Sequence, residues 1–172
     1  MPNIALEIVI EDALWRRIPR LEARLKKAAQ ALHAQLPKHL RFSSKVTVLL
    51  TSDAKIRKLN DDFRGQDKAT NVLSFPQFKP RKLPKKGKSR DEIDLGDIAL
   101  GYQYIVGESV KYNKILINHV THLFIHGILH LLGYDHGLVA EATRMERLEQ
   151  KIMTGLGLPD PYLLQLKEPK VR

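Results

Sequence analysis

The chain has 172 residues, of which 43% are hydrophobic, and this is enough to form one domain around a substantial core. It contains no cysteine, which excludes a disulfide framework and any thiolate metal site. That composition is typical of a reducing compartment, so we predict a cytoplasmic protein. The formal net charge of +10 and the isoelectric point near 9.8 favour an anionic partner, with nucleic acid ahead of an acidic membrane surface.

The sequence predicts no targeting segment and no membrane span. The first fifteen residues have no basic region and no small-residue cleavage site, and Glu7 interrupts their apolar run. Residues 115–134 carry no formal charge, but they contain four histidines and an asparagine. Because histidine is costly in lipid, this stretch predicts a buried helix of a globular domain, and we expect no membrane partner.

Hydrophobic periodicity and capping residues divide the chain into strands and helices. Asp12 can cap a short helical region after the first strand, Pro37 ends the first long helix, Pro76 ends the third strand, and Gly155 follows the last helix. In chain order the pattern predicts a strand at residues 4–10, a helix at 19–35, a strand at 45–51, a helix at 53–62, strands at 70–75 and 93–101, and helices at 102–112, 115–132 and 141–153.

This order of elements predicts an α+β fold. Strands fill the first two thirds of the chain and helices the last third, so we expect a small mixed four-stranded sheet packed with about five helices. Residues 1–172 are expected to form a single domain, with residues 163–172 as a loose tail. The pattern leaves the order of the strands in the sheet open.

Most of the net positive charge falls in one short segment at residues 79–90. The segment interleaves its basic residues with two prolines and a glycine, as a loop between two strands does. It predicts either a clamp for a phosphate backbone or a solvated flexible insertion, and both remain open. Its basic residues are Lys79, Arg81, Lys82, Lys85, Lys86, Lys88 and Arg90.

Histidines line one edge of the helix predicted at residues 115–132. On a helix that advances about 100° per residue, His119, His122, His126 and His130 fall within an arc of roughly 80°. Buried imidazoles need partners, and a metal ion would satisfy several of them at once. For His119, core packing or a surface position is favoured, whereas for His122 a place beside the site and core packing are equally supported.

The sequence from His126 to His136 reads H-x-x-x-H-x-x-G-x-x-H, which is typical of a metal site. His126 and His130 lie one helical turn apart and can face the same ion. Gly133 can adopt a positive φ, end the helix and bring His136 round as a third ligand. Three neutral imidazoles leave a fourth position for water, so we predict one zinc ion per chain, although imidazole also suits nickel, copper and iron.

The residue after the first histidine argues against a protease. The same spacing occurs in metzincin proteases, which have a glutamate there as general base, whereas this chain has Gly127. A zinc ion with three neutral ligands can instead generate hydroxide near neutrality and polarise a phosphate oxygen. Cleavage of a phosphodiester would further need a cation, such as an arginine, close to the metal.

Three stretches of the sequence closely resemble the YbeY family of bacterial endoribonucleases. They are the His126–His136 motif, Phe63-Arg64-Gly65, and the run from Thr70 to Pro76, and the similarity extends from about Lys45 to about Tyr162. The resemblance implies a zinc-dependent, single-strand-specific endoribonuclease in rRNA maturation, at the 3′ end of 16S rRNA, and in ribosome quality control. It further implies single-stranded RNA and the small ribosomal subunit as partners.

The resemblance also implies which residues form the site. His126, His130 and His136 would hold the zinc ion, and Arg64, in the loop predicted at 63–69, would be the catalytic basic residue that faces it. Asp97 and Asp135 would belong to the surroundings. Packing in the strand is favoured for Ser74 over a role as nucleophile. Asn71, where the family commonly has aspartate, and the basic segment depart from the family pattern.

Two other functions remain alternatives. One is a ribosome-assembly binding protein in which zinc is mainly structural. The other is a metal hydrolase that acts on a different substrate, including peptide. The oligomeric state and the residues that transfer protons are not indicated by the sequence.

Overall fold

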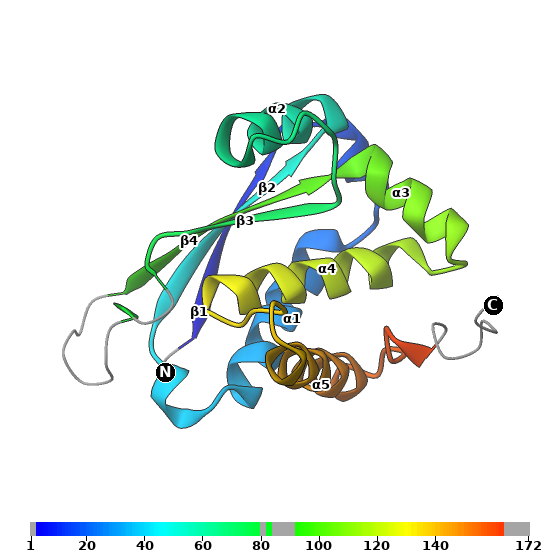
Figure 1. Cartoon of the computed structure of the whole chain (residues 1–172). Coiled ribbons are helices and arrows are strands. Elements are labelled where there is room, and N and C mark those ends of the chain that lie inside the picture. The colour runs from blue at the N-terminus through cyan, green and yellow to red at the C-terminus, as the bar shows by residue number, and fades with distance from the viewer. Residues whose placement is uncertain (1–2, 80–81, 84–91, 164–172) are drawn as a thin grey trace.

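A computed structural model describes residues 3–79, 82–83 and 92–163 of the chain, and four strands in this part form one sheet (Figure 1). Their order across the sheet is β1 (Ile4–Ile10), β2 (Ser44–Thr51), β4 (Ile93–Gly101) and β3 (Val72–Pro76). The first three are parallel to one another, and β3 pairs antiparallel with β4. The predicted mixed, four-stranded sheet is confirmed, and the strand order is new information.

Five α-helices accompany the sheet in the described residues, which confirms the predicted single α+β domain. Figure 1 shows α4 crossing the sheet, with α1 behind it and α5 seen nearly end-on. The helices are α1 (Leu21–Gln35), α2 (Asp53–Arg64), α3 (Tyr102–Lys111), α4 (Leu116–Leu131) and α5 (Val139–Gly155), and two short 3-10 turns span Ala13–Arg17 and Lys38–Leu40.

The main core lies between the sheet and the layer formed by α1, α4 and α5. Leu25 of α1, Val48 of β2, Ile98 of β4 and Phe124 of α4 have no exposed surface in this layer. A smaller cluster, Ile56, Leu73 and Ala99, packs α2 against the opposite face at β3 and β4. Burial of apolar area on both faces of the sheet therefore stabilises this arrangement, in which α4, which carries the histidines, packs against β3 and β4.

Two element boundaries differ from the prediction in a way that matters for function. Helix α2 was predicted to end near Asp62, but it continues to Arg64 and ends at Gly65, whose φ of 65° suits a left-handed cap. Arg64 therefore lies in the last turn of α2. Our prediction that it lies in a loop is wrong. Strand β3 also includes Pro76, which an edge strand tolerates.

Part of the prediction falls outside the described residues. In the basic segment 79–90 only Lys79 and Lys82 of the basic residues are described, and in the tail 163–172 only Leu163 is. The two interpretations of the segment and the interpretation of the tail therefore stay predictions. None of the helices in the described ranges is long and apolar enough to cross a membrane.

Candidate metal centre

Helix α4 and the turn after it present three histidines at one point. Most side chains of α4 are buried, and His126 and His130 lie on its more accessible edge, one turn apart. The helix is followed by Gly133 with a φ of 93°, a conformation that glycine adopts without a Cβ clash. The chain then reverses and brings His136 back over α4, as the spacing predicted.

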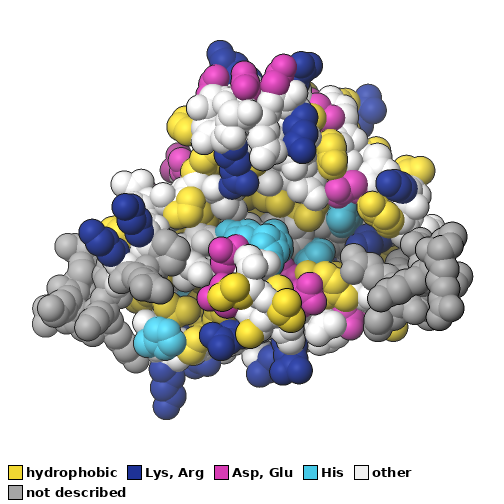
Figure 2. All heavy atoms as spheres, in the orientation of Figure 1, with side chains coloured by type: hydrophobic (Ala, Val, Ile, Leu, Met, Phe, Trp, Pro, Cys, Tyr) yellow, Lys and Arg dark blue, Asp and Glu magenta, His cyan; other side chains and the backbone are white. Residues whose placement is uncertain are grey.

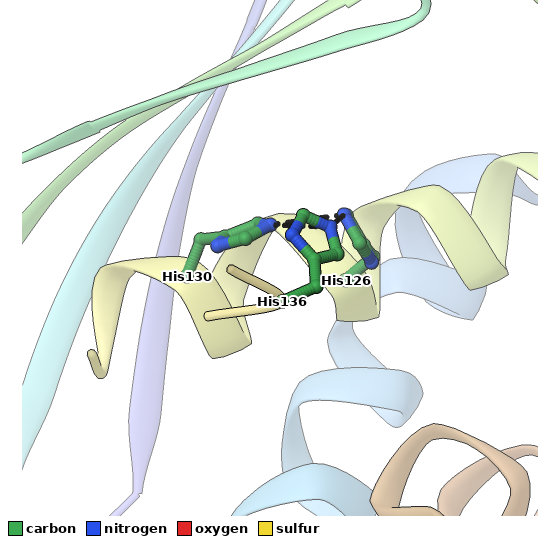
Figure 3. Close-up of side chains that lie close together, drawn as sticks. All are labelled: His126, His130 and His136. Carbon is green, nitrogen blue, oxygen red and sulfur yellow. Dashed lines mark hydrogen bonds between the residues drawn. The ribbon is translucent and has the colours of Figure 1, made fainter. Parts of the chain in front are cut away.

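The three imidazole rings point toward one another (Figure 3). The Nε2 atom of His130 lies 3.0 Å from Nε2 of His126 and 3.3 Å from Nε2 of His136, and the Nε2 atoms of His126 and His136 are also 3.3 Å apart. Among the described residues these three histidines form a group whose ligand atoms could hold a metal ion.

The outward-facing nitrogens of two rings, His126 and His130, show that their converging atoms are electron-pair donors. Nδ1 of His126 donates a hydrogen bond to Glu149 at 2.5 Å, and Nδ1 of His130 donates to the carbonyl oxygen of Tyr134 at 2.9 Å. Both protons therefore sit on Nδ1, because neither partner can donate. The two Nε2 atoms are left with lone pairs and no proton between them, so a cation fits the space that they face.

The protonation of His130 also suits a ligand. Burial, followed by the nearby charges of His126 and His136, lowers the pKa of His130 to about 4. The ring is therefore neutral at neutral pH. Only a neutral imidazole can coordinate a metal, so no proton has to be displaced from it when an ion binds.

Behind the triad, Glu149 of α5 is a carboxylate with no exposed surface. Besides His126, it accepts a hydrogen bond from the hydroxyl of Tyr162, and Nε2 of His122 lies 3.4 Å from its Oε2 atom. Burial would raise the pKa of Glu149, but His122 and His126 outweigh this effect and lower it to about 2. A fixed negative charge thus stands behind His126, an arrangement that orients metal-bound imidazoles in proteins.

In front of the triad, the protein opens into a cavity of about 440 Å³. Arg64 reaches it from the end of α2, and its guanidinium donates a hydrogen bond to the carbonyl oxygen of Ser74 at 3.4 Å. The cavity is also lined by Asn71, Val72 and Pro76 from the β3 side. The structure therefore brings Arg64 to the same cavity as the histidines, as the resemblance implied.

Gly127 faces the sheet, where α4 packs on β3 and β4. A Cβ atom there would come within 3.2 Å of two atoms of Ile98 and 3.3 Å from Oγ of Ser74. Ser74 itself is buried and donates to the carbonyl oxygen of Gly127 at 3.0 Å, which agrees with the predicted packing role. The glycine thus has a packing reason, and the base of a metzincin is missing from its position.

The remaining predicted residues divide into two groups. Asp135 lines the cavity and accepts a hydrogen bond from the backbone of His136, whereas Asp97 is exposed on β4 and does not line it. His119 is buried against Glu108, with 2.7 Å between Nε2 and the carboxylate. His122 is both buried and close to Glu149, so its two predicted roles coincide.

Sequence reasoning missed Glu149, Glu108 and Tyr162. Glu149 carried a signal, because it lies on the apolar stripe of α5 between Met145 and Ile152, where a charged side chain is unusual. Glu108 and Tyr162 carried none that we can identify. Their partners are 11 and 13 residues away and on other elements, so only the tertiary structure shows the contacts.

Comparison with known proteins places the chain in a family. The sequence profile described as Endoribonuclease YbeY matches residues 11–157. The chain belongs to the YbeY endoribonuclease family. The YbeY protein of Bradyrhizobium diazoefficiens is 41% identical over 162 residues, which cover 94% of this chain and 87% of the relative. That of Allorhizobium ampelinum is 39% identical and covers 96% and 99% of the two chains.

A solved structure supports the fold of this YbeY family member. The solution structure of the Thermotoga maritima protein TM1509 aligns with a TM-score of 0.52, covering 97% of this chain and 99% of the other. Its sequence identity is 22%, so this likeness bears on the architecture alone.

Proposed function

We propose that this YbeY family member is a zinc-dependent, single-strand-specific endoribonuclease. In this proposal it acts in rRNA maturation at the 3′ end of 16S rRNA and in ribosome quality control, with the small ribosomal subunit as partner. The observation that carries the proposal is the convergence of three imidazole Nε2 atoms on an open cavity that Arg64 also lines. The relatives named endoribonuclease support the reaction class, and the ribosomal role rests on the family resemblance.

The side chains of the cavity suit a phosphodiester. His126, His130 and His136 would hold zinc, which keeps its full charge with three neutral ligands, polarises a phosphate oxygen and lowers the pKa of water to about 7. Arg64 presents a planar guanidinium that matches the geometry of phosphate oxygens. It would orient the phosphate and stabilise the negative charge that develops on it during cleavage.

The proposal is tested by RNA cleavage with identically purified wild type and variants. We expect wild type to contain about one zinc per chain and to cut single-stranded RNA. His130→Ala should lose both properties. Arg64→Ala should keep its zinc and lower kcat by about 100-fold, the effect of removing one donor to a developing oxyanion.

Arg57→Ala is the matched control for Arg64→Ala. Arg57 is on the same helix, but it pairs with Asp67 at 2.6 Å and does not line the cavity. The Arg57→Ala variant should cleave RNA as wild type does. Cleavage that persists unchanged in His130→Ala would show that the triad is not the reactive site.

The same preparations discriminate the two alternative functions. A ribosome-assembly protein with structural zinc would lose thermal stability in His130→Ala while wild type shows no cleavage of its own. A peptidase would cleave casein and leave RNA intact. Asp135 is the one carboxylate among the described residues that line the cavity, and it is engaged with the backbone of His136, which does not favour a peptidase base.

A further inference from the structure

The two upstream histidines of α4 line a second cavity, separate from the one that holds the triad. It has a volume of about 180 Å³ and lies between the start of α4, the end of α5 and the segment that follows α5. Its walls are mainly apolar. They include Ile115, His119, His122, Met153, Pro159 and Pro161.

Buried imidazole nitrogens supply polar points in this apolar cavity. His119 is 6% exposed and His122 is 8% exposed. Nε2 of His119 is held by Glu108, but Nδ1 of His119 and Nδ1 of His122 have no hydrogen-bond partner among the described residues. Buried polar atoms of this kind cost free energy unless a ligand pairs with them, and an imidazole nitrogen can donate or accept according to its tautomer.

These walls have the chemistry of a pocket for a nucleobase. A base is planar, with apolar faces that pack on side chains and an edge of donors and acceptors. Met153 and the two prolines offer apolar contact to the faces, and the nitrogens of His119 and His122 offer partners to the edge. Lys114 and Asp160, also in the lining, carry opposite charges, so the pocket favours a neutral group such as a base over a phosphate.

The second cavity is lined by His122, which lies one helical turn before His126 of the triad on α4. The ring of His122 is 6.4 Å from the ring of His126, and its other neighbour is Tyr162, at 5.4 Å with an edge-on geometry. Histidine side chains gather in the middle of the face shown in Figure 2, over α4. A strand whose phosphate lies at the triad therefore has a neighbouring base within reach of this cavity.

We propose that the cavity lined by His119 and His122 is a base pocket, which takes one unpaired base of the RNA strand adjacent to the phosphate that lies at the triad. The inference rests on the proposed nuclease function. It gives a structural reason for single-strand specificity, because a base within a duplex is stacked and paired and cannot enter.

The first experiment measures the contribution of the base alone. Titration calorimetry compares adenosine 5′-monophosphate with ribose 5-phosphate, which has the same sugar and phosphate and no base. For zinc-loaded wild type we expect the nucleotide to bind about tenfold more tightly, within the range measured for one stacked base. Equal dissociation constants for the two compounds would overturn the base pocket.

Two variants test whether the preference for the nucleotide over ribose 5-phosphate arises in the cavity. In His119→Gln the side-chain amide can replace Nε2 and keep the bond to Glu108, while no polar atom remains at the position of Nδ1. Ile115→Ser removes an apolar wall that is 66% exposed, and serine suits this N-cap position of α4, so the fold is retained. In both, we expect the preference for the nucleotide to fall below about threefold.

Val110→Ser is the matched control for Ile115→Ser, since Val110 is 78% exposed on α3 and does not line the cavity. It should bind both compounds as wild type does. A preference for the nucleotide that is retained in His119→Gln and in Ile115→Ser would place the base elsewhere and overturn the proposal.

The second experiment distinguishes a base of an RNA strand from a free nucleotide. It uses a series of single-stranded RNA substrates in which one nucleotide lacks its base. The position of this abasic nucleotide differs from one substrate to the next. We expect KM to rise about tenfold when the missing base is next to the cleaved bond, and this rise to disappear in His119→Gln. Equal KM values for every position of the abasic nucleotide would exclude the pocket as a site for RNA. Failure of wild type to cut intact RNA would instead refute the proposed function, and nucleotide binding would still report on the pocket.

Discussion

The buried carboxylate of Glu149 accepts a hydrogen bond from Nδ1 of His126 at 2.5 Å and thereby turns Nε2 of that ring toward the other two histidines. The carboxylate is held in turn by the hydroxyl of Tyr162. A buried charge without such partners would be strongly destabilising, so the contacts fix both the charge and the ring. The histidine triad is thus supported from α5 as well as from α4.

Replacing Glu149 should weaken zinc binding. Glu149→Gln keeps the size of the side chain but removes the charge behind His126, and loss of such a partner lowers metal affinity by about 10- to 100-fold. Competition with a chromophoric chelator measures the dissociation constant. Glu146→Gln, an exposed neighbour on α5, is the control and should not change it. An unchanged constant in Glu149→Gln would mean that the carboxylate does not act on the metal.

Zinc should stabilise the wild type, and it should not stabilise a variant in which the triad is incomplete. A ligand that binds only the folded state adds about 2.7 kcal/mol at a free concentration of 100 times its Kd. His136 is half exposed, so His136→Ala should melt like metal-free wild type but gain little when zinc is added. Thermal melting with and without a chelator tests this, with the exposed His39→Ala as control. An equal zinc-dependent rise in Tm for His136→Ala would place the ion elsewhere.

Two helical glycines should respond to alanine in opposite ways. Gly107→Ala in α3 meets open space, so the better helix propensity should stabilise the protein by up to about 1 kcal/mol. Gly127→Ala must push Ile98 and Ser74 aside, and overpacking of about 1–3 kcal/mol should exceed that gain. Urea unfolding measures both free energies. A stabilised Gly127→Ala would show that β3 and β4 yield easily at this contact.

Glu108 should make stability depend on acid pH. Burial would raise its pKa, but hydrogen bonds from His119 and Asn71 outweigh burial and hold it below the ordinary value of 4.5. The stabilisation is therefore complete above pH 4.5 and is lost as the pH falls through the folded-state pKa. Glu108→Gln should be less stable than wild type at pH 7, and this difference should shrink between pH 5 and pH 3.

Urea unfolding across that pH range is the measurement for Glu108→Gln. Glu141→Gln, an exposed carboxylate at the start of α5, is the control. A difference between wild type and Glu108→Gln that stays constant with pH would show that the carboxylate has no linked proton in this range.

The parts of the site that are local in sequence could be predicted from it. His126 and His130 lie on one helix and His136 follows a glycine turn, so helical geometry and the spacing determine their meeting. Arg64 could be assigned only through the family resemblance, because no periodicity connects the end of α2 with α4. Its placement in a loop was wrong because the prediction ended α2 before the cap at Gly65.

The parts that depend on the packing of distant elements could not be predicted. The strands follow recognisable β-rich runs, but the insertion of β4 between β2 and β3 depends on long-range pairing. Gly96 shows the reason: its Cβ would lie 2.1 Å from the carbonyl oxygen of Phe75, a close approach that only the assembled sheet reveals. Likewise, the partners of Glu149 lie on α4 and after α5, and nothing in the spacing connects them.

The three histidines are held with unequal firmness. His126 and His130 stand on a helix whose other sides are in the core, whereas His136 is half exposed on the short connection after Gly133. We therefore expect that an ion held by the triad would enter or leave through movement of His136, without opening of the core. Substitutions in the connection from residue 133 to residue 138 should then change the rate of metal exchange more than the dissociation constant of the metal.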